Sequence, residues 1–131
     1  MKINFKSIAL LAIGAAAICQ TATAHHSFAM FDLTKSITLN GTVKTFEWTN
    51  PHSWLWLTVK AEDGTDQTWG IETGSPSMLL RRGMQRTVFK AGDKVAVEIH
   101  PNRDGTTGGN FMKATFPDGR TYAIVVGKEE Q

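Results

Sequence analysis

Four histidines are the residues of this chain best suited to chemistry: His25, His26, His52 and His100. The first two directly follow Ala22-Thr23-Ala24, which has the small-x-small pattern of a signal-peptide cleavage site. Cleavage at this junction would give His25 a free α-amino group. An amino-terminal histidine offers both its amine nitrogen and a ring nitrogen to one metal ion, so the sequence predicts a terminal chelate.

The residues before this junction have the composition of an export signal. Two lysines form a basic start, and the apolar run 8–18 is too short to span a bilayer. We expect residues 1–24 to be removed and residues 25–131 to form one exported domain, periplasmic or secreted. Removal takes two of the 14 Lys+Arg, leaving 12 against 12 Asp+Glu, and it takes the single cysteine, Cys19. This composition predicts no nucleic-acid partner, no integral membrane segment and no disulfide.

The other two histidines are candidates to complete the metal site. In the fold expected below, His52 lies in the loop between the first two strands and His100 ends the fourth strand, and both loops flank one binding face. Two nitrogens of His25 and one from His52 or His100 would form a T-shaped set, which favours Cu(II). Alternatively, the amine with the amide and ring nitrogens of His26 would bind copper as a terminal peptide motif, without help from the fold.

Simpler roles for the same residues stay open. The terminal pair can be a solvated chain start, His52 can cap a turn after its proline, and His100 can bond to backbone at a strand end. Met30 and Met112 are soft donors that suit Cu(I). The leading hypothesis is copper carriage, with delivery to another exported metalloprotein or redox protein.

Tryptophans form a second group of candidate residues. Trp54 and Trp56 alternate with apolar residues and are expected to point outward, with Trp69 of the next strand on the same face. Three indoles there could stack on a flat or sugar-like ligand, which defines the alternative function, a non-metal ligand- or partner-binding module. Phe28 and Phe31 could instead pack on this face and hold the chain start in place.

The polar residues give little support for an enzyme. The sequence contains no nucleophile-elbow serine and no helix-borne histidine pair, and the domain without its signal has no cysteine. Glu47, Glu72 and Glu98 are scattered along strands without the spacing of an acid–base pair. A copper-dependent oxidoreductase is therefore the least favoured hypothesis.

The elements that must position these residues follow from hydrophobic alternation and turn residues. A parity change near Lys44 and Thr45 predicts a bulge in the first strand. Ser75, Pro76 and Gly83 predict a short helix between strands three and four. The expected elements are an arm over 25–35, strands over 36–48, 53–61, 67–73 and 95–100, a flexible loop over 102–110, and a closing hairpin over 111–116 and 122–126. This order is that of an all-β, OB-like Greek-key barrel of five to six strands.

Four segments of the chain also carry a resemblance to a known family. They are the opening His25–Asp32, the triplet Gly41–Val43, the segment Trp48–Ser53 and the turn Gly92–Val95. Together they resemble domain-of-unknown-function family 6152 (DUF6152). The resemblance extends over nearly all of residues 25–131, and it implies a small exported bacterial protein with a compact β domain. It implies no activity, so function must be argued from the residues.

Overall fold

The computed structural model describes residues 28–124. The chain divides into two units, Met1–Met30 and Phe31–Gln131, and the barrel belongs to the second. The predicted cleavage site, His25, His26 and the end of the closing hairpin lie outside the described residues. Within the described part, no helix is long and apolar enough to cross a membrane.

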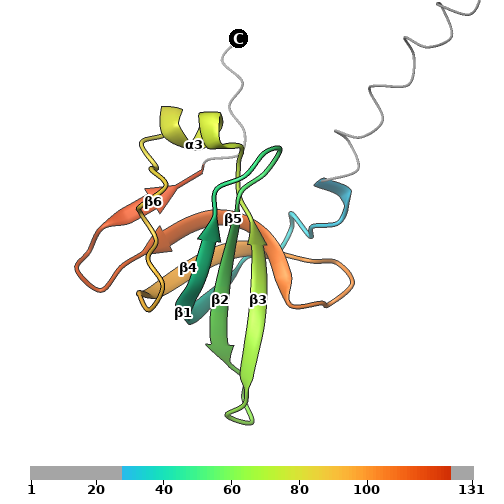
Figure 1. Ribbon diagram of the computed structural model, residues 1–131. Helices are drawn as coiled ribbons and strands as arrows, with labels where there is room; N and C mark the ends of the chain where they lie inside the picture. Colours follow the sequence, from blue (N-terminus) through green and yellow to red (C-terminus); the bar gives the residue numbers. More distant parts are fainter. Residues whose placement is uncertain (1–27, 125–131) are drawn as a thin grey trace, which may run out of the picture. The chain divides into compact units, whose positions relative to one another are not determined.

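Strands and one short helix follow each other along the second unit in the predicted order (Figure 1). Their bounds are β1 Ile37–Glu47, β2 Trp54–Lys60, β3 Asp66–Glu72, α3 Pro76–Arg81, β4 Lys94–Pro101, β5 Gly108–Thr115 and β6 Thr121–Ala123. The helix between the third and fourth strands is therefore confirmed.

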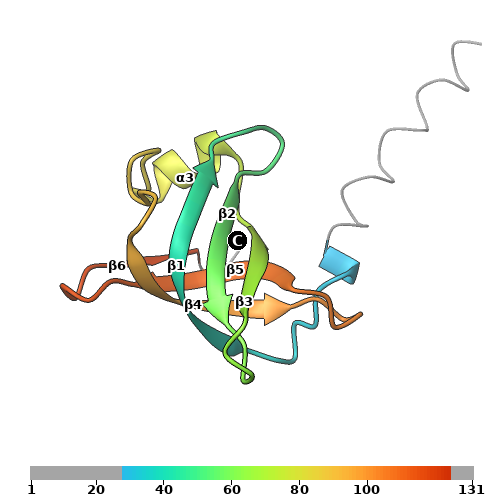
Figure 2. The same ribbon diagram turned by 60° about the horizontal axis from the view of Figure 1, so that its bottom comes forward.

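The sheet closes on itself to form a barrel. Its neighbours run in the order β3-β2-β1-β4-β5-β6, and β3 pairs a second time, in parallel, with β5. Five strands thus form a closed ring, and β6 adds to β5 outside it (Figures 1 and 2). The expected OB-like Greek-key barrel is confirmed.

The first strand serves both halves of the barrel because it bends. Its first half pairs with β4 and its second half with β2. Gly41 lies where the two pairings overlap, and a Cβ at this position would lie only 2.9 Å from the carbonyl oxygen of Thr58. The register shifts between Val43 and Thr45, which confirms the predicted bulge. The shift lets both Val43 and Phe46 pack in the core.

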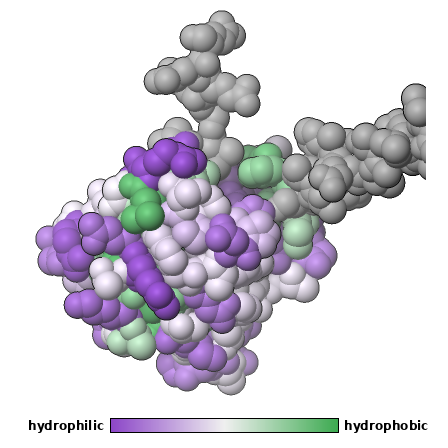
Figure 3. Space-filling view, turned by 45° about the horizontal axis from the view of Figure 1, so that its top comes forward, coloured by the Kyte–Doolittle hydropathy of each residue, from purple (hydrophilic) through white to green (hydrophobic). Residues whose placement is uncertain are grey.

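Apolar side chains fill the barrel, and α3 contributes to the same core. Ser75 caps this helix by accepting the Met78 N–H at 3.3 Å, a contact worth about 1 kcal/mol. Leu79 of α3 is fully buried. The helix lies at the end of the barrel opposite the β2–β3 hairpin (Figure 1). With the α3 end turned forward, the surface shows apolar colour only in small separate patches (Figure 3).

The prediction of a flexible loop over 102–110 is wrong for its last three residues. Gly108 and Gly109 begin β5 and pair in parallel with β3. A Cβ on Gly108 would lie 2.9 Å from the carbonyl oxygen of Gly70, and one on Gly109 would overlap the carbonyl oxygen of His100. These glycines are needed for close approach of the strands, not for flexibility.

We predict that Gly109→Ala destabilises the barrel by about 3 kcal/mol, because the added methyl group must push β5 away from β4. Gly64→Ala is the control, since a Cβ there meets nothing within 4 Å. Its positive φ alone should cost about 1 kcal/mol. Urea unfolding followed by tryptophan fluorescence measures both. Equal losses for the two variants would contradict the close approach at Gly109.

Candidate functional site

One row of paired residues crosses the outward face of the barrel, strand by strand. Directly paired residues point to the same face of a sheet, and the sequence neighbours of this row, such as Leu55 and Ile71, are fully buried in the core. We call it the outward row; its members, in the order β1, β2, β3, β5, β4, are Glu47, Trp54, Glu72, Asn110 and His100.

His52 lies beside this row, in the loop between β1 and β2. Thr49 donates its hydroxyl to the carbonyl oxygen of His52 at 3.0 Å, and Thr73 donates its N–H to the carbonyl oxygen of buried Ser53 at 2.9 Å. The ring Nδ1 of His52 lies 2.6 Å from Oε1 of buried Glu72. A carboxylate accepts hydrogen bonds, so Nδ1 carries a hydrogen, and in the neutral ring Nε2 has the lone pair.

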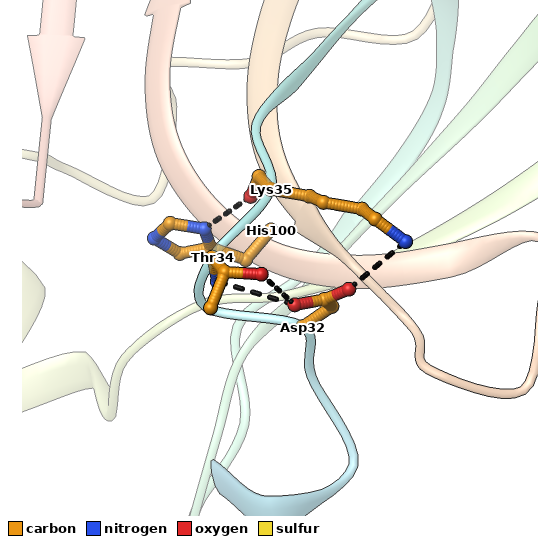
Figure 4. Close-up of polar contacts among 4 residues, drawn as sticks. All are labelled: Asp32, Thr34, Lys35 and His100. Carbon is orange, nitrogen blue, oxygen red and sulfur yellow. Dashed lines mark hydrogen bonds and ion pairs between the residues drawn. The ribbon is translucent and has the colours of Figure 1, made fainter.

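His100 is held in a similar way by a backbone group. Its Nδ1 lies 2.6 Å from the carbonyl oxygen of Lys35. A carbonyl oxygen can only accept, so Nδ1 is the donor here also. The second ring nitrogen, Nε2, points away from Lys35 (Figure 4). In the neutral form, both described histidines therefore have their lone pair on Nε2.

The segment that holds His100 is fixed to the barrel. Phe31 forms an isolated β-bridge with Asn102. Asp32 accepts hydrogen bonds from the N–H and hydroxyl of Thr34 at 3.2 and 2.6 Å, and Lys35 Nζ lies 3.1 Å from its other oxygen (Figure 4). These contacts, those of Thr34 first, lower the pKa of Asp32 to about 2. The resulting turn presents the Lys35 carbonyl to His100.

The two aromatic residues of the arm differ. Phe31 is only 2% exposed although it lies outside the main core cluster, so it is buried, and its packing on the tryptophan face stays a prediction. Phe28 is 47% exposed and belongs to the other unit of the chain, so its packing on the tryptophan face stays a prediction. The arm is therefore fixed from Phe31 onward.

The structure places His52 and His100 near one row but does not bring them into contact. β5 separates Glu72, the partner of His52, from His100, and two strand spacings amount to about 10 Å. Within residues 28–124, no group of three His, Cys, Asp or Glu side chains is placed to hold a metal ion. The terminal pair lies outside the described residues, so the metal site stays a prediction.

Two of the three candidate tryptophans share the outward face. Trp54 and Trp56 stack with ring centroids 5.9 Å apart and planes inclined by 22°. Trp56 covers Gly70, where a Cβ would lie 2.7 Å from the indole ring. Trp69 pairs instead with fully buried Leu57 and packs against the core. The predicted three-indole face is therefore wrong for Trp69.

Three buried side-chain atoms have no hydrogen-bond partner among the described residues: Trp56 Nε1, Asn102 Oδ1 and Asn110 Oδ1. Each such atom costs about 1–3 kcal/mol if it stays unpaired. The amide of Asn102 lies over Gly108, because a Cβ on that glycine would be 2.7 Å from Asn102 Nδ2. Unpaired buried polar groups are rare in native proteins and can mark a binding site.

A comparison with protein families identifies the family of the chain. Residues 13–111 match the Family of unknown function (DUF6152). The chain belongs to this family. The match includes the whole outward row and ends within β5 of this DUF6152 protein. No characterised protein and no solved structure is detectably similar to it.

Sequence reasoning missed the residues that surround the histidines in this DUF6152 protein. Glu72 had a usable signal, because counting outward from the hairpin turn at 62–64 places it opposite Trp54. Asn110 and Asn102 had none, since they lay in the segment expected to be a loop. Lys35 contributes only its backbone, which no residue pattern reports.

We predict that the Asp32 turn loses its contribution to stability in acid. The folded pKa is lowered from 3.8 to about 2, so the contribution is full above pH 3.8 and is lost as the pH falls through about 2. The stability gap between the parent and Asp32→Asn should therefore close over this range. Urea midpoints measured from pH 6 to pH 2 test this, with Glu62→Gln as a charge control. A gap that is constant with pH would refute it.

Proposed function

We propose that this DUF6152 protein is exported, loses residues 1–24, and carries a transition metal, copper by preference, in the periplasm or outside the cell. His25 supplies its amine and a ring nitrogen, His52 or His100 supplies the third nitrogen, and His26 assists. The protein would deliver the metal to another exported metalloprotein or redox protein.

The hydrogen bonds of the two described histidines carry this proposal. A metal-binding histidine usually donates its other ring N–H to a carboxylate or a backbone carbonyl, which fixes the ring and its tautomer. His52 does so to Glu72, and His100 does so to Lys35. In its neutral form, each ring has on Nε2 the lone pair that a metal ion requires.

The length of chain before the barrel also supports the proposal. Phe31 is fixed by its bridge to Asn102, and His25 lies six residues earlier. An extended chain covers about 3.4 Å per residue, so His25 can reach about 20 Å from Phe31. His100 lies two residues from Asn102, or about 7 Å along the strand, and Glu72 lies about 10 Å beyond it. Either third ligand is within that range.

Copper is preferred because of the donor set. The ligands proposed are imidazole and amine nitrogens, and Cu(II) binds such sites most tightly among the common divalent ions. The α-amine titrates near pH 7.7–8.0 when unperturbed, so a metal ion displaces its proton at modest cost. Exposed Met30 and half-buried Met112 remain proposed soft donors for Cu(I).

A second candidate function rests on the Trp54–Trp56 stack. Two stacked, half-buried indoles on the outward face suit a flat ligand, a sugar or a partner protein. It is the weaker proposal, because Trp69 does not extend the stack.

We predict that one glycine added before His25, or His25→Ala, weakens Cu(II) binding about 100-fold or more, because the terminal chelate is lost. Competition against a chromophoric chelator measures the affinity. A residue added after Gln131 is the control and should have no effect. If the extended protein binds copper as tightly as the parent, the terminal site is refuted and the indole face becomes the leading candidate.

We predict that Glu72→Gln weakens Cu(II) binding about 10- to 100-fold, because His52 loses the carboxylate that orients it. Glu62→Gln, in the exposed hairpin turn, is the matched control. His52→Phe should weaken binding at least as much as Glu72→Gln. Weakening by His100→Phe alone would assign the third nitrogen to His100, and no change in any of these variants would exclude both histidines.

A further inference from the structure

Three hydrogen-bond acceptors gather on the outward face where β3 meets β5. Glu72 and Asn110 are paired in register, so their backbones are about 5 Å apart. Both are buried, at 6% and 8% exposed. The amide of Asn102 lies over Gly108, two residues before Asn110 on the same side of β5. We call Glu72, Asn102 and Asn110 the acceptor cluster.

The side-chain oxygens of the acceptor cluster can only accept hydrogen bonds. Asn102 donates its Nδ2 to Thr106 Oγ1 at 2.9 Å, which identifies its Oδ1 as the atom without a partner in the described part of the chain. Asn110 Oδ1 likewise has no partner there. A carboxylate has about four lone-pair positions, so the Glu72 carboxylate can accept several hydrogen bonds at once. A ligand for this cluster must therefore bring N–H or O–H groups.

The charges and rings of the outward row favour a cation. The carboxylates of the outward row belong to Glu47 and Glu72, and they flank Trp54 on either side. No Lys or Arg belongs to this row. An ammonium group near stacked indoles gains cation–π attraction as well.

We propose that the acceptor cluster binds the amino end of a peptide chain. The ammonium group donates to Asn110 Oδ1 and to the Glu72 carboxylate, and the backbone N–H of the third residue donates to Asn102 Oδ1. In an extended peptide the first and third nitrogens are about 7 Å apart, which matches the two-residue repeat from Gly108 to Asn110. An ammonium has three donors, and capture of a terminal amine is an established mode of peptide recognition.

The same chemistry can come from two sources, the processed end of this chain or the amino end of another peptide. The first source rests on the proposed function, because it requires cleavage before His25. The reach of about 20 Å from Phe31 includes the cluster. A metal-bound amine keeps two N–H groups, so docking and metal binding are compatible. The second source needs no processing.

The test uses metal-free protein in two forms, one beginning at His25 and one carrying Gly-Ser-Gly-Ser before it. The probe is the tripeptide amide His-His-Ser, and its N-acetylated form is the control. Calorimetry gives the affinity, and the side-chain amide NMR signals of Asn102 and Asn110 report the place of binding.

In the extended form, we expect the free tripeptide to bind at least about tenfold more tightly than the acetylated one, because the acetyl group removes the charged donor. Asn110→Leu should weaken binding about tenfold, and Asn110→Asp should strengthen it. Asn40→Leu, at an exposed position of β1, is the matched control and should change nothing.

The two forms distinguish the sources. If the processed end of the chain occupies the cluster, the form beginning at His25 has shifted amide signals and resists the tripeptide. If that form binds the tripeptide as the extended form does, the ligand comes from another peptide. The proposal is overturned if the free and acetylated tripeptides bind alike or if neither binds. Copper titration tests the proposed function separately. Absence of copper binding with tripeptide binding intact would refute only the proposed function. Absence of tripeptide binding with copper binding intact would refute only this inference.

Discussion

The close approach of β3 and β5 is the contact on which the rest of the structure depends. Only three residue pairs make it, and two of them involve the glycines at 108 and 109. Without this pairing the strands would form an open, curled sheet with two edges. With it, side chains that are distant in sequence meet on one outward face, and Glu72 comes to lie beside Asn110.

This closure also supports the candidate site. His52 lies in a loop that is tied to β2 and β3 through buried Ser53, and His100 lies near the end of a strand whose neighbour is β5. Each ring then donates one further hydrogen bond that fixes its rotation. Sites built on strands and supported by such bonds hold their geometry better than sites on loops. Phe31 is the point from which the preceding chain must approach.

Local pattern predicted most of the fold. The parity change before Phe46 gave the bulge, and Ser75 with Pro76 gave the helix start, because both features depend on neighbours in sequence. Trp69 was also predictable: it has the same parity as buried Ile71, and alternation alone places it inward. The start of β5 was not predictable, since only contact with β3 explains why glycines stand in a strand there.

The residues of the candidate site also divide into those that the local sequence predicts and those that it does not. The histidines were found from residue type, and Glu72 lay within reach of a hairpin count. Asn110 depends on parallel pairing across the barrel, which no local signal reports. The outward row takes one residue from each of five strands, so it exists only in the folded state.

The hydrogen-bond acceptors of His52 and His100 differ in how well they tolerate substitution. The acceptor for His100 is the main-chain carbonyl of residue 35, which every amino acid possesses. A different side chain at this position would still present the carbonyl to His100 if the turn persists, although the contact of Lys35 Nζ with Asp32 in that turn would be lost. The acceptor for His52 is a side chain, and only an acidic residue of similar length reproduces it. One support depends on the shape of the backbone, and the other depends on the identity of a single side chain.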